Sequence, residues 1–191
     1  MDRKKAVFLV ISDLHDQILG IKKIKEWLDN LKFDAVICCG DLTSAQTKNQ
    51  TERIQNIINL IRQHHLPFFT IFGNNERKES QNLLQEEGVL LQEEYFLNYH
   101  LVGISGWGEI IPALKNPIDE NTILVTHIPP KFEQKINLHH APFLHLHGHI
   151  HMPYNKKVIG NTTIISVPPL LSGKALKITL NNRQIKTQIL K

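Results

Sequence analysis

The chain has 191 residues, of which 41% are hydrophobic and 21% are charged, and its formal net charge is +4. This is the composition of a globular domain of ordinary size, so it excludes intrinsic disorder and fibrous repeats, and we expect residues 1–191 to form a single domain. The positive charge is small and the basic residues are scattered, so composition gives no clear nucleic-acid-binding track. The eleven histidines raise the expectation of a metal site.

The first apolar run, residues 6–11, follows a short basic segment. It is too short for the hydrophobic region of a signal peptide or for a membrane span, so we expect a soluble cytoplasmic protein with no membrane association. Cys38 and Cys39 are adjacent in a second apolar run, which makes a disulfide between them geometrically implausible. We interpret both as small buried hydrophobic residues.

Strands and helices alternate in the first half of the chain. The strands are continuous apolar runs, typical of strands buried on both faces, and the first two helices show apolar residues at helical spacing. The expected strands cover residues 6–11, 34–39 and 67–72, and the expected helices cover residues 18–31, 54–61 and 79–86. Two successive strand–helix–strand units predict a parallel sheet with right-handed crossovers.

The second half contains short strands, and Gly-Asn and Asn-Asn turns separate the later ones. The expected strands cover residues 89–91, 95–97, 101–105, 123–126, 143–147, 158–159, 163–167, 175–180 and 184–190. A parallel α/β half followed by a strand-rich half predicts an α/β domain in which two sheets pack together with helices outside.

Five short polar motifs follow five of the expected strands. They are Asp13-Leu14-His15, Gly40-Asp41, Gly73-Asn74-Asn75-Glu76, Thr126-His127 and Gly148-His149-Ile150-His151. In open α/β sheets, ligands bind outside the carboxyl ends of the strands. Each of these five strand ends is followed by Asp, His or Asn, whose oxygen and nitrogen atoms are ligands for divalent first-row metals.

Each motif alone has an ordinary explanation. Gly-Asp after a strand is usually a turn, and Gly-Asn-Asn can be a left-handed turn. The five motifs together, in order and at five strand ends, favour a metal site over turn chemistry.

This ordered set resembles the motifs of the calcineurin-like metallophosphoesterase family, across residues 13–151. The resemblance implies the metallo-dependent phosphatase fold, a four-layered αββα sandwich of two mixed β-sheets flanked by helices. It also implies two divalent metal ions, which could be Mn, Fe, Zn or Ni, with Mn favoured in vitro. By motif, Asp13, His15 and His151 would bind one ion, Asn74, His127 and His149 would bind the other, and Asp41 would bridge the pair.

The resemblance implies a metal-dependent phosphoesterase acting on a small phosphate-ester substrate, with diesters favoured over monoesters. Cyclic nucleotides and other nucleotide phosphates belong to this class. Two metals about 3.5–4 Å apart can activate a shared water and hold phosphate oxygens, so a metal-bridging hydroxide would attack phosphorus in line with the leaving oxygen.

Asn75 departs from the family pattern, which has a histidine after the metal-binding asparagine. An amide donates a hydrogen bond but transfers no proton near neutral pH. One interpretation is an enzyme in which Asp41 and Asn75 are catalytic and Asn75 contacts the phosphate. The other is a metal-loaded but weak or inactive scaffold that binds protein partners.

Three further features bear on the substrate. Arg77 could contact its phosphate or form a surface ion pair. Trp107 could stack on a base, but we interpret it as a packing residue. His147 is expected to support the site rather than to bind metal. Residues 105–119 and 128–142 are expected to form the walls that determine specificity.

Overall fold

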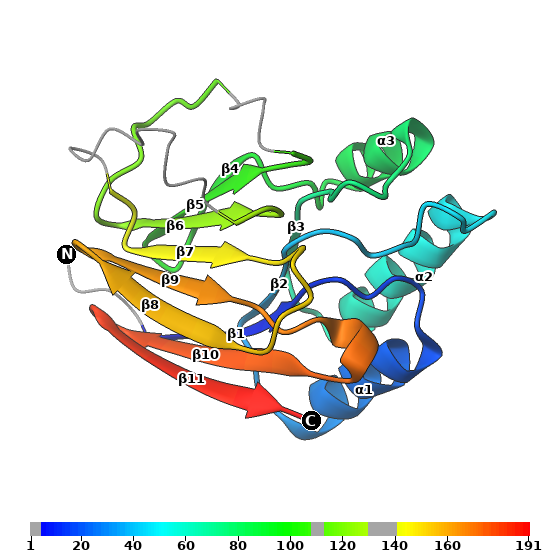
Figure 1. Ribbon diagram of the computed structural model, residues 1–191, viewed down its shortest axis with the longest axis horizontal. Helices are drawn as coiled ribbons and strands as arrows, with labels where there is room; N and C mark the ends of the chain where they lie inside the picture. Colours follow the sequence, from blue (N-terminus) through cyan, green and yellow to red (C-terminus); the bar gives the residue numbers. More distant parts are fainter. Residues whose placement is uncertain (1–4, 108–112, 130–140) are drawn as a thin grey trace.

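The computed structural model describes residues 5–107, 113–129 and 141–191, and these form two β-sheets packed face to face with helices against one of them (Figure 1). The first sheet has five strands in the order β11-β10-β1-β2-β3, and the second has six in the order β4-β5-β6-β7-β9-β8. Both sheets are mixed, so the predicted α/β fold class is confirmed.

The elements largely follow the predicted ranges. The strands are β1 (Ala6–Ile11), β2 (Ala35–Cys38), β3 (Phe68–Thr70), β4 (Glu93–Phe96), β5 (Tyr99–Ile104), β6 (Thr122–Thr126), β7 (Leu144–His147), β8 (Asn155–Ile159), β9 (Thr162–Ser166), β10 (Ala175–Asn181) and β11 (Gln184–Leu190). The helices are α1 (Ile18–Asn30), α2 (Gln50–Gln63) and α3 (Lys78–Glu86), with a short 3-10 helix, η2 (Leu170–Ser172). The strand expected at residues 89–91 is instead a single bridge between Thr70 and Leu90.

The five-stranded sheet joins the two ends of the described chain. Strand β1 pairs in parallel with β2 and in antiparallel with β10, so that Val7 faces Thr179 in the register. The predicted parallel sheet therefore exists as β1, β2 and β3, and the C-terminal hairpin β10–β11 extends it on the other side of β1.

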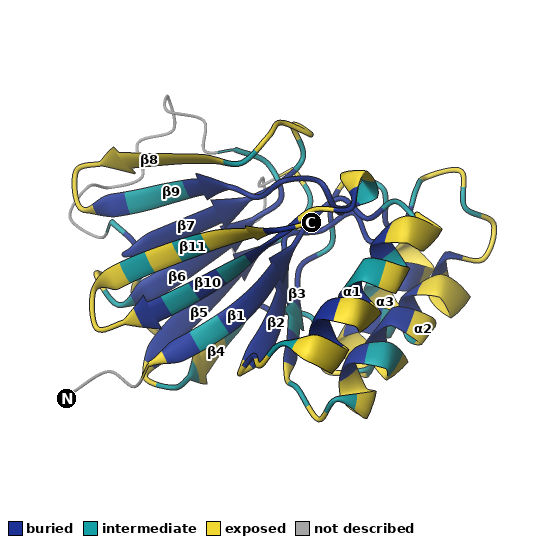
Figure 2. Cartoon of the chain, turned by 90° about the horizontal axis from the view of Figure 1, so that it is seen from below, coloured by how far each residue is buried: buried dark blue, intermediate teal, exposed yellow. Residues whose placement is uncertain are grey.

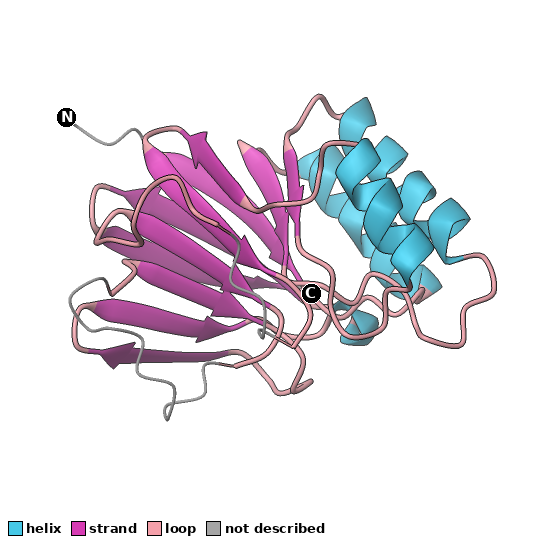
Figure 3. Ribbon diagram, turned by 90° about the horizontal axis from the view of Figure 1, so that it is seen from above, coloured by secondary structure: helices cyan, strands magenta, loops and turns pink. Residues whose placement is uncertain are grey.

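The continuous apolar character of β1 reflects burial on both faces. Phe8 and Val10 face the second sheet, whereas Leu9 and Ile11 face the helices. Figure 3 shows all three α-helices on the same side of the molecule, and Figure 2 shows their outward faces exposed. Helices α1 and α2 thus each bury one apolar stripe against this sheet.

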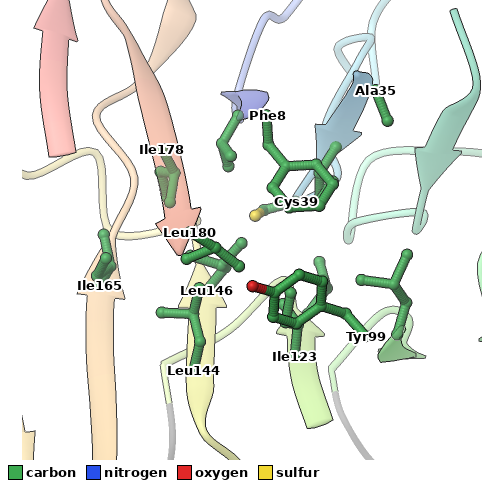
Figure 4. Close-up of a cluster of buried hydrophobic side chains, with 14 of the residues drawn as sticks. Phe8, Ala35, Cys39, Tyr99, Ile123, Leu144, Leu146, Ile165, Ile178 and Leu180 are labelled. Carbon is green, nitrogen blue, oxygen red and sulfur yellow. The ribbon is translucent and has the colours of Figure 1, made fainter. Parts of the chain in front are cut away.

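The main core lies between the two sheets (Figure 4). Phe8 and Ile178 come from the five-stranded sheet and meet Tyr99, Leu146 and Ile165 from the six-stranded sheet, all with at most 1% of their surface exposed. The adjacent cysteines point to opposite sides, Cys39 into this core and Cys38 toward the helices, and both are free, as predicted.

The outer face of the six-stranded sheet carries a smaller apolar cluster. Val102, Ile104 and Leu124 are covered there by Leu114 and Ile118. No helix of the described residues lies on this face; the fourth layer of the expected sandwich is not represented among them. Nor is any helix within the described ranges long and apolar enough to cross a membrane.

Candidate metal centre

The five motifs meet at one edge of the molecule. They follow β1, β2 and β3 in the first sheet and β6 and β7 in the second, each at the carboxyl end of its strand. Because these strands are parallel within each sheet, their carboxyl ends share an edge. All seven residues that the motifs predict as metal ligands are connected there by contacts between side-chain nitrogen and oxygen atoms.

The first group comprises Asp13, His15 and His151. The Nε2 atoms of the two histidines lie 3.0 Å apart, and they lie 3.9 Å (His15) and 3.4 Å (His151) from Oδ1 of Asp13. One ligand atom from each of the three residues lies within 4.8 Å of the others, close enough to hold a single ion.

The second group is centred on His127. Its Nε2 atom lies 2.9 Å from Oδ1 of Asn74, 3.2 Å from Nδ1 of His149 and 3.3 Å from Oδ2 of Asp41. The same Asp41 oxygen lies 3.7 Å from Nε2 of His15. Asp41 therefore lies between the two groups, where a residue shared by two ions would have to be.

The hydrogen-bond chemistry of His127 shows that these residues fit a cation. Its Nδ1 atom lies 2.8 Å from the carbonyl oxygen of Cys39, which only accepts, so Nδ1 carries the hydrogen. In the neutral ring, Nε2 then presents a lone pair to the acceptor oxygens of Asn74 and Asp41. A shared positive charge stabilises acceptor atoms that converge in this way. Carboxylate, amide and imidazole ligands, with no thiolate among them, suit a divalent first-row metal.

Opposing effects set the protonation of this pair. Burial alone would raise the pKa of Asp41, but its hydrogen bond and charge interaction with His127 and the two N–H groups of Asn75 outweigh burial and hold the pKa below its usual value. Burial would lower the pKa of His127, but Asp41 raises it above normal. A proton on His127, which Asp41 favours, and a bound cation would both place positive charge among these acceptors.

The backbone at the site is in a sparsely populated conformation. Five of the seven predicted ligands have positive φ: Asp13, His15, Asp41, His149 and His151, with values between 47° and 70°. Asp and His tolerate this region better than most residues, yet each such position costs free energy and persists only where the surroundings impose it. The fold therefore holds these side chains in a local geometry that the backbone would not choose.

Two glycines allow the motif loops to approach one another closely. A Cβ atom on Gly73 would lie 2.0 Å from Oδ1 of Asp41, and one on Gly148 would lie 1.8 Å from Oγ of Ser12. Glycine is therefore needed at both positions, because any side chain would collide with the neighbouring loop, whatever the role of the glycine in its own turn.

Glu76, the last residue of the third motif, holds the loops after β2 and β3 together. Its buried carboxylate accepts hydrogen bonds from the backbone N–H groups of Gly73 (2.7 Å), Thr43 (3.1 Å) and Asp41 (3.3 Å). Burial and the nearby charge of Asp41 raise its pKa to about 7. Glu76 belongs to a motif predicted from the sequence, but the motif does not indicate that its carboxylate is buried between the two loops.

Gln50 was not predicted from the sequence and is a second support. Its buried amide donates to the carbonyl oxygens of Ser44 and Asn75, and its oxygen accepts from the N–H of Arg77 and the hydroxyl of Ser80. A polar residue at the start of a helix is common, so no pattern marked it.

The residues predicted to contact substrate lie in different places. Asn75 turns toward Asp41, to which its side-chain Nδ2 donates at 2.5 Å and its backbone N–H at 3.1 Å. Arg77 is exposed, and its guanidinium donates to the carbonyl oxygen of Ala45 at 2.6 Å. Asn75 is therefore part of the cluster, whereas Arg77 belongs to the neighbouring loop.

Trp107 does not pack as expected. Its side chain is 56% exposed, and its ring meets that of His149 edge-on, with centroids 5.3 Å apart. His147 is buried on β7, with Nδ1 3.3 Å from the carbonyl oxygen of Gly148. Residues 108–112 and 130–140, within the expected specificity walls, lie outside the described residues.

Comparison with known proteins identifies the family of the chain. A family model described as calcineurin-like phosphoesterase matches residues 6–178. The chain therefore belongs to the calcineurin-like phosphoesterase family, whose members are metal-dependent hydrolases of phosphate esters.

Solved structures share the fold at low sequence identity. A Thermus thermophilus protein is 15% identical, with a TM-score of 0.72 over 97% of this chain and 99% of that one. An archaeal phosphodiesterase is 16% identical, with a TM-score of 0.61 over 96% and 99%. A dimetal phosphatase from Danio rerio is 9% identical, with a TM-score of 0.65 over 97% and 98%. A comparison with curated protein sequences gave no match.

Proposed function

We propose that this chain is a cytoplasmic phosphodiesterase that hydrolyses small phosphodiesters, nucleotide phosphates among them, with two divalent cations. Asp13, His15 and His151 would bind one cation, Asn74, His127 and His149 the other, and Asp41 both. The observation that carries the proposal is the convergence of these seven side chains, with acceptor atoms facing acceptor atoms. The archaeal phosphodiesterase with the same fold supports the same activity.

When bound, the cations would hold phosphate oxygens and lower the pKa of an attacking water; Mn²⁺ is the first to test. The two aspartates would neutralise only part of the charge of two divalent cations, so the site would attract a phosphate anion. Asn75 would fix the orientation of Asp41 through its two hydrogen bonds and thereby position the bridging carboxylate.

The charge around the cluster supports a diester rather than a monoester. A monoester dianion is usually held by arginine forks. Within the described ranges, Arg77 is the arginine nearest to the motifs in sequence, and it is bonded to Ala45. Because Asn75 cannot protonate a leaving group, esters with good leaving groups should be the best substrates.

The replacement of the family histidine by Asn75 supports one alternative, a metal-loaded scaffold with little or no catalysis. The complete set of predicted ligands supports the enzyme, because a scaffold has no evident need for all seven. The two alternatives differ in turnover, not in metal binding.

The test is hydrolysis of bis-p-nitrophenyl phosphate and p-nitrophenyl phosphate with Mn²⁺ or with chelator. We expect metal-dependent cleavage of the diester in preference to the monoester. Asp41→Asn should lose at least 100-fold in kcat, on the order of the loss when an essential electrostatic group is removed. Asp29→Asn, on the exposed face of α1, is the matched control. Binding of about two metals with cleavage of neither compound would favour the scaffold.

A further inference from the structure

A cavity of about 170 Å³ lies beside the last motif, over the outer face of the six-stranded sheet. Its floor comes from β7, β9 and β8, which are neighbours in the sheet (Figure 1). His147, Ser166 and Asn155 form a row across these strands, because His147 pairs with Ser166 and Ser166 with Asn155 in the register. Residues opposite one another in a sheet share a face, so these polar groups line the same side of the cavity.

The floor holds polar atoms that the protein leaves unused. Ser166 is 5% exposed, and its buried hydroxyl has no hydrogen-bond partner within the described residues. His147, also 5% exposed, directs Nδ1 to the carbonyl oxygen of Gly148, and its Nε2 has no partner in the same part of the chain. Buried polar groups are nearly always satisfied, so the Ser166 hydroxyl indicates a ligand that provides hydrogen-bonding atoms, and Nε2 of His147 offers such a ligand a second partner.

The walls of the cavity are mostly apolar, and Lys157 adds one charged side chain. Ile150 and Met152 remain 44% and 55% exposed, and Ile164 closes the cavity from β9. Apolar walls with a few convergent polar groups are the usual composition of a small-molecule site. A cavity of about 150 Å³ holds one benzene ring, so this one has room for a single six-membered ring.

The cavity lies within reach of a phosphate at the candidate metal centre. His147 lines the cavity, and His149, two residues later, belongs to the metal cluster. Their Cα atoms are at most about 7 Å apart, since each residue spans no more than about 3.6 Å. Ile150 of the cavity wall stands between the predicted ligands His149 and His151.

We propose that this cavity binds a planar six-membered ring carried by the phosphate ester, such as the base of a pyrimidine nucleotide. Ser166 and His147 hydrogen-bond to the polar edge of the ring, and Ile150, Met152 and Ile164 contact its faces. The volume matches one ring, so a second fused ring would extend out of the cavity and purine nucleotides bind less well. This inference rests on the proposed function, because the cations anchor the phosphate.

Met152 provides a direct measurement of occupancy. The chain contains two methionines, Met1 and Met152, so ¹³C-methyl labelling gives two resonances, which a Met152→Leu variant assigns. The protein is loaded with Zn²⁺, which is diamagnetic, and titrated with thymidine 5′-monophosphate. We expect an upfield or downfield ring-current shift of the Met152 signal that saturates, with a smaller response to adenosine 5′-monophosphate and none to ribose 5-phosphate.

Two variants of one residue connect the shift to the cavity. Ser166→Ala removes only the hydroxyl and should weaken thymidine monophosphate binding about two- to tenfold, the range for one hydrogen bond. Ser166→Leu fills the space and should abolish the shift. Ile159→Ala, on the exposed end of β8 and outside the cavity, is the control and should bind as the parent does. A Met152 signal that responds equally to ribose 5-phosphate, or to nothing, would overturn the proposal.

A second experiment separates this inference from the proposed function. Methyl p-nitrophenyl phosphate and thymidine 5′-p-nitrophenyl phosphate share a leaving group, so the ratio of their kcat/KM values reports the non-leaving group. We expect a ratio in favour of the thymidine ester that falls toward one in Ser166→Leu. Hydrolysis of both esters with no such preference and no Met152 shift would reject the ring site alone. A saturating shift without hydrolysis of either ester would reject the phosphodiesterase and keep the ring site.

Discussion

Asn75 shows how one side chain can change the chemistry of a shared arrangement of ligands. The residue lies where the family has a histidine, and its amide is bonded to Asp41 rather than left free to face a leaving group. It has no proton to transfer, so departure of the leaving oxygen depends on that oxygen's own acidity. Under the proposed function, the identity of this single residue would decide which esters react.

Asn75→His should therefore help poor leaving groups most. A correctly placed general acid contributes about 10²–10⁴-fold, and this gain is largest for leaving groups of high pKa. We expect the slope of log kcat against leaving-group pKa, measured over a series of aryl methyl phosphates, to become shallower. Asn75→Ala, which removes the side-chain contact with Asp41 without adding an acid, is the control. An unchanged slope in the histidine variant would contradict this account of Asn75.

Gly148 illustrates a residue whose function is to occupy no space. Its backbone is in an ordinary conformation, so Gly148→Ala would cost only the clash of the new Cβ with Ser12 and Asp13. We expect a loss of about 1–3 kcal/mol in the free energy of unfolding, measured by urea titration. Gly160→Ala is the comparison, because that position has positive φ but no atom near the new Cβ. A smaller loss at Gly148 than at Gly160 would mean that the motif loops can separate without cost.

Among the elements, β4 pairs with β5 and carries one carboxylate that joins both strands to a later segment of the chain. Glu93 accepts hydrogen bonds from the backbone N–H groups of Lys115 (2.6 Å) and Asn116 (3.0 Å), and His100 lies 3.0 Å from it. The N–H of Lys115, followed by the Asn116 side chain, lowers the pKa of Glu93 to about 2. Glu93 thus connects β4 and β5 to the segment that covers the outer face of their sheet.

This contact should make stability depend on pH in a defined window. The ionised form of Glu93 is favoured in the folded state, so its contribution is complete above the unfolded pKa of about 4.3 and is lost as pH falls toward 2. The difference in urea midpoint between the parent and Glu93→Gln should be constant from pH 7 to 5 and shrink by pH 3. The neighbouring, exposed Glu94→Gln is the control. A difference that stays constant down to pH 3 would show that the carboxylate charge is not involved.

The elements also show what a sequence can predict about a fold. The strands and helices of the first half were predictable because their periodicity is local, and five motifs were predictable because each follows such a strand. The pairing of β1 with β10 was not, since register between distant strands depends on packing across the whole core. Residues 89–91 are apolar enough for a strand but meet only Thr70, which leaves one bridge.

The supports of the site were not predictable for a related reason. Gln50 and Glu76 are polar residues whose importance comes from burial, and burial arises only when distant elements meet. The left-handed backbone at Asp13 and His149 is likewise imposed by the folded surroundings. The candidate ligands could be predicted from the sequence because their residue types indicate metal binding. The burial and backbone conformation of the site could not, because they depend on contacts between distant elements.

For the whole molecule, the site should couple metal binding to stability. Without a bound cation, the facing acceptors and the left-handed backbone would make the cluster a locally unfavourable part of the fold. A cation bound only by the folded state at 100 times its Kd adds about 2.7 kcal/mol, which corresponds to an increase in Tm on the order of 5–10 °C for a chain of this size.

Differential scanning calorimetry with Mn²⁺ and with chelator measures this increase. Asp13→Asn should lower the increase, because it removes charge shared by the first group, while Asp29→Asn should leave it unchanged. An equal increase in all three proteins would place the stabilising cation elsewhere.

The position of β1 between β2 and β10 has a consequence for synthesis of the chain. Val7 emerges from the ribosome well before its partner Thr179, which is made more than 170 residues later. At about 5–20 residues per second, β1 waits roughly 10 to 35 s with one edge unpaired. During that interval a nascent chain offers a strand edge and an apolar face to any neighbour, so chaperone capture should be strongest before the C-terminal hairpin is released.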